Sequence, residues 1–333
     1  MRAVVPKQSC ELATELDAKV RRYAGASLAE STRSTYRRHF GFFTTWCKAH
    51  GRASIPASVE TVTLYLADVA DRYRPDTLSG FLSVIAHAHR AAGHTFDRTN
   101  FKVILEGIHR TYGSPSRQKT GITIDELRAL VVSLPDTLMG ARDRVILTLG
   151  FAAALRPGEL VGLDIGRAAA NSTGSVEITP EGLRLTLSRT QVDETPIVKA
   201  VPRGGSPCPV EALERWLALA DIVRGPVLRQ MNRSARHLEH RRLHRKAVDR
   251  IVKRTVYAQA VQAGMHRNAA RARASRFSGY SLRVGFVTSA VRAGASSESI
   301  ARHVGWKTMY MMAQYRRKGG LFHKHPVQRV LAS

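Results

Sequence analysis

Apolar residues recur every three or four positions through the first third of the chain, and this spacing predicts amphipathic helices. The clearest run begins near Ser31 among Ser and Thr residues suited to a helix cap, carries aromatic residues at helical spacing, and ends at Gly51. Similar spacing bounded by Pro, Gly, Asp or Asn predicts further helices at about 58–73, 75–92 and 101–112. We therefore expect a helical domain at residues 28–112, after an N-terminal extension at residues 1–27.

The helical pattern then breaks. Residues 113–121 read GSPSRQKTG, a polar stretch without apolar periodicity that is typical of a linker between domains. Residues 122–333 would form a second domain. Its first helix, in ITIDELRALVVSL, has Thr123 or Asp125 near its cap, and the segment ARDRVILTLGFAAAL is apolar enough to be a buried central helix.

Strand patterns occur in one place only. Segments 176–179, 183–188 and 196–201 are rich in β-branched residues and are separated by turn residues, which predicts three antiparallel strands. The expected fold is therefore mainly α with a small antiparallel β-sheet, a helical domain being followed by an α+β domain.

Charge directs attention to a polyanionic partner. Lys and Arg number 52 against 26 Asp and Glu among 333 residues, which gives a formal net charge of +26. Such a field favours nucleic acid, although a protein bound to a membrane surface would share this balance. Residues 231–254 hold nine of these cations at helix-like positions, forming either a solvated helix face or a face that follows DNA phosphates.

Cysteine content and hydropathy exclude several classes of protein. Cys10, Cys47 and Cys208 stand far apart, so neither a disulfide framework nor a zinc site is indicated. The N-terminus lacks the apolar core of a signal peptide, and no later stretch approaches the roughly 18 apolar residues of a membrane span. We expect a cytoplasmic, nucleoid-associated protein without a membrane partner.

The chemistry concentrates near the C-terminus, in YSLRVGFVTSAVRAGASSESIARHVGWKTMYMMAQYRR. Arg283, Trp306 and Tyr315 lie there 23 and 9 residues apart, and an upstream LRPGEL contributes Arg156 and Glu159. In this order and spacing, the set resembles the tyrosine recombinase (phage integrase) family, and the SLRVG wording with the tryptophan is similar to its Cre branch. The resemblance covers residues from about 119 onward well and implies that they form the catalytic domain, with residues 28–112 as the core-binding domain.

The resemblance implies a role for each of these side chains. Tyr315 matches the nucleophile that forms a 3′-phosphotyrosyl bond with DNA, and Arg156 and Arg283 match the pair that grips the phosphate. Glu159 matches the acidic residue that orients the site, and Trp306 the position of an N–H donor. The two arginines would also favour the phenolate, and no metal or nucleotide cofactor is needed. Double-stranded DNA would be the partner, clamped between the domains, with a homotetramer holding two duplexes.

Two positions depart from the family pattern. Tyr280 stands where the family usually has a histidine. The family lysine, expected to protonate the leaving oxygen, belongs in a turn that here offers Arg189 or Gln191, and neither is a good acid. Lys199, on the next strand, is a weaker substitute. His303 is a further proton carrier by type, but its position favours a cap at a helix end.

These departures keep a second hypothesis open. Taken singly, each residue has an ordinary explanation: a core tyrosine or tryptophan, a surface ion pair, an arginine that binds phosphate without chemistry. The alternative to a recombinase is therefore a catalytically impaired DNA-binding accessory or regulatory protein of the same fold. A basic RNA-binding protein is a weaker interpretation, because no aromatic stacking motif is present. The terminal residues 321–333 would dock on a neighbouring protomer or on their own domain.

Overall fold

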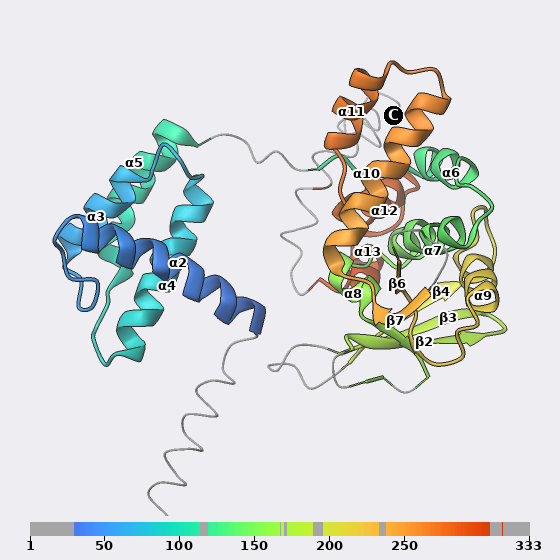
Figure 1. Cartoon of the computed structure of the whole chain (residues 1–333), viewed down its shortest axis with the longest axis horizontal. Helices are drawn as coiled ribbons and strands as arrows, with labels where there is room; N and C mark the ends of the chain where they lie inside the picture. Colours follow the sequence, from blue (N-terminus) through green and yellow to red (C-terminus); the bar gives the residue numbers. More distant parts are fainter. Residues whose placement is uncertain are drawn as a thin grey trace, which may run out of the picture. The chain divides into compact units, whose positions relative to one another are not determined.

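The chain divides into two compact units, Met1–Arg117 and Gln118–Ser333, in a computed structural model (Figure 1). The structure describes residues 30–113, 119–166, 168–169, 172–188, 196–232, 238–306 and 315. The division falls inside the segment 113–121 that the sequence predicts as a linker. The predicted N-terminal extension, residues 1–27, and the C-terminal segment, residues 321–333, lie outside the described residues.

All the regular elements in the described residues of the first unit are helices, joined by loops. Its elements are α2 (Glu30–Ala49), α3 (Val59–Asp68), α4 (Pro75–Ala91), the 3-10 helix η1 (Arg98–Phe101) and α5 (Lys102–Tyr112). The Ser58 side chain caps α3 by accepting from the amide of Thr61, and Gly51 takes a positive φ of 61° just after α2. The core is aromatic: Phe43, Tyr65 and Phe81 are almost fully buried. The predicted second helix is shorter than expected and ends at Asp68 rather than near residue 73.

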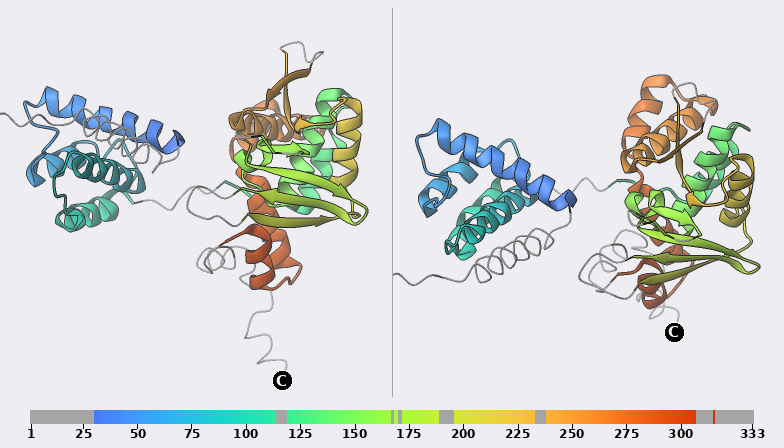
Figure 2. Two further views of the ribbon diagram at one scale, coloured as in Figure 1. Left: turned by 90° about the horizontal axis from the view of Figure 1, so that it is seen from below. Right: turned by 60° about the horizontal axis from the view of Figure 1, so that its bottom comes forward.

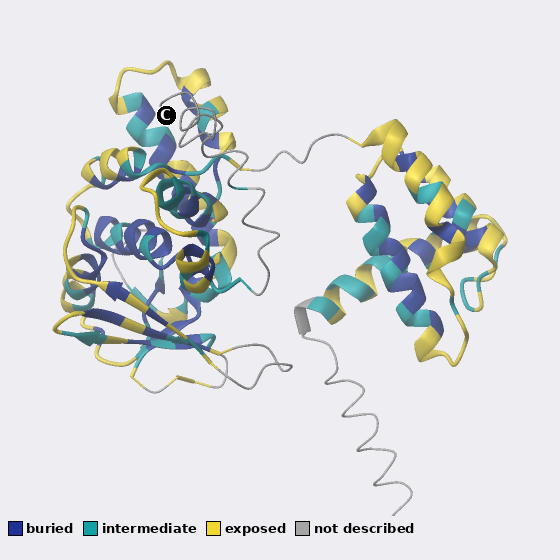
Figure 3. Cartoon of the chain, turned by 180° about the vertical axis from the view of Figure 1, so that it is seen from behind, coloured by how far each residue is buried: buried dark blue, intermediate teal, exposed yellow. Residues whose placement is uncertain are grey.

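The second unit holds eight described helices, and one of them is central. They are α6 (Ile124–Val132), α7 (Leu138–Ala152), α8 (Pro157–Val161), α9 (Pro209–Leu219), α10 (Arg245–Gln262), α11 (Arg267–Ser275), α12 (Tyr280–Arg292) and α13 (Ser297–Val304). Helix α7 is buried along most of its length, as its apolar sequence predicts (Figure 3). Thr123 caps α6 through a reciprocal capping box with Glu126, and this settles the open choice of its cap residue.

A mixed sheet lies beside these helices (Figure 2). Its strands are β1 (Leu163–Ile165), β2 (Gly174–Thr179), β3 (Gly182–Leu187), β4 (Ile197–Pro202) and β5 (Gly225–Pro226), in the order β4-β3-β2-β1-β5. The three predicted strands, β2 to β4, pair antiparallel as expected. The sheet as a whole is not purely antiparallel, because β1 joins β2 in parallel. Strands β1 and β5 are too short to carry a periodic signal in the sequence.

The basic stretch at residues 231–254 is only partly helical. Strands β6 (Arg229–Met231) and β7 (Leu238–Arg242) form a two-stranded antiparallel sheet, and α10 starts after it. Charged residues have low strand propensity, so pairing between the two strands is what overrides the local preference here. Within the described residues, no helix combines the length and the apolar character that crossing a membrane would need.

Candidate active site

The C-terminal turn of α7 is the point where distant segments meet. Its residues 152–154 present three consecutive carbonyls, and each accepts a hydrogen bond from a different element. His303 Nε2 on α13 donates to the first at 2.8 Å, Lys199 Nζ on β4 to the second at 2.9 Å, and Arg283 Nη1 on α12 to the third at 2.6 Å. The carbonyl end of a helix dipole attracts cations and donors, so this turn gathers the polar side chains of the site.

Arg156 and Glu159 are fixed by the start of α8. Arg156 is the N-cap residue and Pro157 begins the helix, so Arg156 does not share a helix face with Glu159 as their spacing suggests. Instead the Glu159 carboxylate accepts from the main-chain N–H of Arg156 at 2.7 Å and from its Nη1 at 2.5 Å. Burial opposes the charge on Arg156, but Glu159 and Tyr280 outweigh it and raise the pKa of this guanidinium. Within the RPGE sequence, Pro157 starts the helix and Glu159 fixes the orientation of the Arg156 side chain.

Arg283 is a buried cation with unused donors. Its side chain is fully buried on α12, and Nη1 donates to the carbonyl of Ala154. Its Nε and Nη2 have no hydrogen-bond partner within the described part of the chain. Burial, together with the neighbouring Arg156, lowers the pKa of Arg283. A guanidinium edge left without partners in the interior is suited to an anion with two oxygens, such as a phosphate.

Trp306 and Tyr315 complete the group. Gly305 ends α13 in the left-handed conformation, with a φ of 78°. The chain changes direction there, and the next residue, Trp306, packs beside Arg283. The Arg283 Cζ lies 5.9 Å from the centroid of the Trp306 ring, and the Tyr315 ring centroid lies 5.3 Å from that of Trp306. Tyr315 is half-buried and packs on the small apolar cluster around Val304.

The surroundings of the Tyr315 hydroxyl favour its protonated form. Burial raises its pKa, Tyr280 raises it further, and only Arg283 lowers it. Of the two arginines expected to favour the phenolate, only Arg283 lowers the pKa of Tyr315, and the effect of burial on this pKa is larger. Tyr280, at the first position of α12, is 37% exposed, so its phenol stands at the edge of the group.

The structure thus brings together six of the predicted side chains: Arg156, Glu159, Tyr280, Arg283, Trp306 and Tyr315. The remaining two, Arg189 and Gln191, lie outside the described residues.

Lys199 belongs to this group although the sequence ranks it low. It is 4% exposed, and Nζ also donates to the carbonyl of Val304 at 3.3 Å. Burial lowers its pKa to about 8, with Arg283 and Arg156 acting in the same direction and Glu159 opposing them. A signal was present in the sequence, since strand alternation places Lys199 on the same buried face as Val201.

His303 has a different role from the one its sequence position suggests. It lies in the last turn of α13, yet it bonds to the end of α7 rather than to its own helix. Burial lowers the pKa of this imidazole. Among the described residues, no group of three or more His, Cys, Asp or Glu side chains is placed to hold a metal ion.

Comparison with known proteins identifies the class to which this arrangement belongs. The model of the phage integrase family matches residues 121–319. A curated relative, the integrase/recombinase xerD homolog of Selenomonas ruminantium, is 30% identical over 325 residues, which cover 95% of this chain and 89% of the relative. The chain belongs to the phage integrase family and is a site-specific tyrosine recombinase. The Cre-like branch is not confirmed by these matches.

Solved structures show the same fold at low identity. A Tn1549 transposon integrase in complex with transposon right end DNA has a TM-score of 0.61 at 12% identity, covering 90% of this chain and 93% of that one. A lambda integrase dimer bound to a COC′ core site has a TM-score of 0.54 at 14% identity, covering 92% and 77%.

Proposed function

We propose that this recombinase cleaves and rejoins double-stranded DNA through a 3′-phosphotyrosyl bond to Tyr315, in integration, excision or resolution. The observation that carries the proposal is the buried Arg283 guanidinium, which has two donors without a partner in the described chain and lies beside the Trp306 and Tyr315 rings. A scissile phosphate placed there would receive hydrogen bonds from Arg283 and lie within reach of the phenol.

The chemistry follows from these groups. The Tyr315 oxygen attacks phosphorus, and the ester that forms conserves the energy of the phosphodiester for rejoining. Negative charge grows on the non-bridging oxygens in the transition state, where Arg156 and Arg283 stabilise it without a metal. Glu159 holds Arg156 in place through two hydrogen bonds. Burial raises the pKa of Tyr315, so the phenol still carries its proton at neutral pH when it meets the phosphate.

Duplex DNA is the proposed partner of both units. The Tn1549 integrase and the lambda integrase dimer were both solved on DNA, and this chain shares their fold and carries a net charge of +26. Residues 28–112 act as the core-binding domain and residues 122–333 as the catalytic domain. Four protomers on two duplexes exchange strands, and the protein works at the nucleoid.

A covalent trapping experiment tests this function. The DNA site is first selected from a randomised duplex library by binding to the full-length protein, and it is then nicked so that the cleaved strand end diffuses away. We expect the wild-type protein to accumulate a covalent adduct, Tyr315→Phe to form none, and the control Tyr257→Phe to behave like the wild type. A wild-type protein that binds its selected site but never forms an adduct would overturn the proposal in favour of a DNA-binding accessory protein.

A further inference from the structure

The helix that carries Arg283 is capped by a side chain of another helix. Asp249 lies on α10, and its Oδ1 accepts a hydrogen bond from the main-chain N–H of Gly279 at 2.7 Å. Gly279 is the N-cap residue of α12, and as a glycine it has no side chain that could cap the helix itself. The cap of α12 therefore comes from α10.

Asp249 does not take the partners that its own helix offers. Arg245 and Lys253 lie four residues before and after it on α10, a spacing at which opposite charges commonly pair. Among the described residues, however, the carboxylate forms no ion pair and has no hydrogen-bond partner besides the Gly279 amide. A negative charge beside a helix N-terminus also interacts favourably with the helix dipole. These observations indicate that Asp249 serves α12 and not the surface of α10.

Three helices meet at Gly279. A β-carbon on this residue would lie 2.8 Å from Val248 Cγ1 on α10 and 3.0 Å from Cγ of Pro157, the first residue of α8. The first distance is shorter than the contacts of real β-carbons and the second is at their limit, so glycine is what allows the three helices to approach this closely. Both arginines of the site belong to this junction, since Arg156 directly precedes Pro157 and Arg283 lies near the start of α12.

We propose that Asp249 is a positioning residue for DNA cleavage, the proposed function on which this inference rests. By holding the start of α12 against α10 and α8, its carboxylate sets the place of the Arg283 guanidinium relative to that of Arg156. Both guanidiniums have to reach the oxygens of one phosphate, so a small displacement of one helix start puts them out of register with it. Asp249 acts through the main chain of α12 and not by contact with DNA.

A cap that only stabilises the fold would have a different signature. Loss of any helix cap lowers the stability of the folded protein. Loss of this cap should also slow the chemical step in molecules that are folded and bound to DNA, because the phosphate meets two misplaced guanidiniums. The adduct rate at saturating protein and the affinity for DNA therefore distinguish the two roles.

Single-turnover adduct formation on the selected nicked duplex tests the assignment. With the full-length protein in saturating excess, we expect Asp249→Ala to form adduct at least about tenfold more slowly than the wild type. Its dissociation constant for the same duplex, measured by fluorescence anisotropy, should stay within about twofold, because the exposed cations Arg250 and Lys253 of α10 are unchanged. Asp249→Asn keeps an oxygen for the Gly279 amide, so its rate should lie within about threefold of the wild type.

The matched control removes a cap at a distance from the site. Thr137 Oγ1 accepts from the amide of Gly140 and caps the start of α7, whereas the carbonyl that holds Arg283 follows the end of that helix. Thr137→Ala should lower the midpoint of urea unfolding, as Asp249→Ala does, but keep the wild-type adduct rate. A Thr137→Ala protein as slow as Asp249→Ala would overturn the proposal, because any loosening of the fold would then slow the reaction.

A second variant disturbs the same junction from α12 and keeps the assignment testable if Asp249→Ala folds poorly. Gly279→Ala places a methyl group against Val248 and Pro157, and it should slow adduct formation at unchanged affinity in the same way. A wild-type rate at saturating protein in Asp249→Ala would overturn the proposal, as would an Asp249→Asn protein as slow as Asp249→Ala. A wild-type protein without any adduct would instead refute the proposed function.

Discussion

At the scale of single residues, the buried Arg283 side chain lowers the stability of the folded protein. Its Nε and Nη2 donors lack partners in the described chain, although the side chain is fully buried. Each such donor costs about 1–3 kcal/mol relative to the unfolded chain, where water satisfies it. The neighbouring Ala154, which accepts from Nη1, has a φ of 49°, a left-handed conformation that is uncommon for alanine. Strain and unmet donors at one point are consistent with a group that waits for an anion.

This argument predicts a variant that is more stable and inactive. Arg283→Met removes the buried charge and both unmet donors, while the length and apolar character of methionine suit the buried space that the arginine occupies. We expect the free energy of unfolding of the DNA-free protein, measured by urea titration, to rise by about 1–3 kcal/mol. Adduct formation should fall at least about 100-fold, since a major source of transition-state charge stabilisation is gone.

Its control is Arg292→Met, an exposed position at the end of the same helix. That change should leave both the stability and the adduct rate close to those of the wild type. A loss of stability in Arg283→Met would show that the bond to Ala154 outweighs the unmet donors.

At the scale of elements, the first turn of α8 couples folding to the orientation of Arg156. Glu159 accepts from both the main chain and the side chain of Arg156, so Glu159→Ala should lower the free energy of unfolding by about 1–2 kcal/mol. Adduct formation should slow by roughly tenfold or more, because the guanidinium loses the group that fixes it.

Two further variants separate the cap from the charge. Glu159→Gln keeps an oxygen for the main-chain N–H, and its stability should lie within about 1 kcal/mol of the wild type because the Arg156 side chain is half-exposed. Glu214→Ala removes the Arg203–Glu214 ion pair elsewhere on the surface and should leave the adduct rate unchanged. An adduct rate unaffected by Glu159→Ala would mean that Arg156 needs no carboxylate to hold it.

The elements also show what a sequence can and cannot reveal. Local caps mark several helix ends in the sequence, because Ser58, Thr123 and Gly305 each satisfy or terminate a helix with their own atoms and their neighbours. The end of α3 at Asp68 has no such cap and is predicted about five residues too late. Strands β1 and β5 were missed because two or three residues carry no period, and they exist through pairing with distant strands. The hairpin of β6 and β7 was missed because its charged residues have low strand propensity, and it also depends on pairing between the two strands.

The site residues also fall into those that the sequence predicts and those that only the fold reveals. Spacing and resemblance pointed to Arg156, Glu159, Arg283, Trp306 and Tyr315, which the fold does gather. The sequence ranks Lys199 low because its place in the site depends on two carbonyls, 46 and 105 residues away, that no local pattern connects with it.

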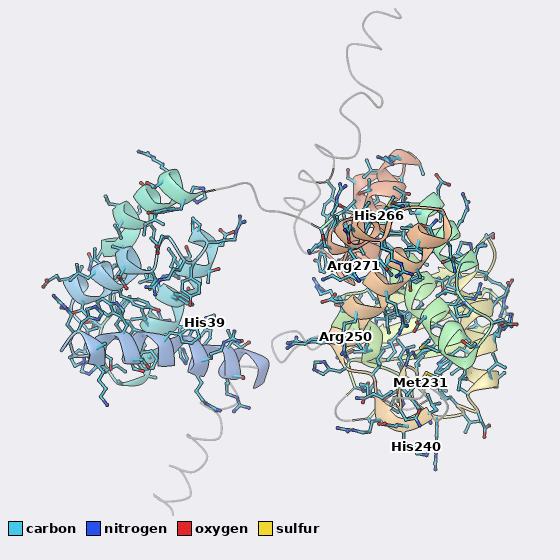
Figure 4. The ribbon with its side chains drawn as sticks, turned by 45° about the horizontal axis from the view of Figure 1, so that its top comes forward. His39, Met231, His240, Arg250, His266 and Arg271 are labelled. Carbon is cyan, nitrogen blue, oxygen red and sulfur yellow. The ribbon has the colours of Figure 1, made fainter. Side chains whose placement is uncertain are left out.

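At the scale of the whole molecule, part of the net charge of +26 lies on two neighbouring helices. Helices α10 and α11 pack together in the second unit and expose Arg250, Lys253, Arg267 and Arg271. Figure 4 labels Arg250 and Arg271 on these helices. The apolar face of α10, with Val248, Ile251 and Val252, is buried in the core. In the helical part of this basic stretch, one face therefore packs in the core and the opposite face exposes cations. That these cations follow DNA phosphates stays a prediction.

This distribution predicts how DNA binding responds to salt. Each phosphate neutralised by a protein cation contributes about −0.9 to the slope of the logarithm of the binding constant against the logarithm of salt concentration. If α10 and α11 follow the backbone, the full-length double variant Arg250→Gln/Arg271→Gln should flatten that slope by roughly 1–2, measured by fluorescence anisotropy on the selected duplex. The control Arg184→Gln/Arg302→Gln removes the same charge from side chains already paired with Glu177 and Glu298, and its slope should match that of the wild type. Equal flattening in both variants would mean that total charge, and not this helical face, sets the affinity for DNA.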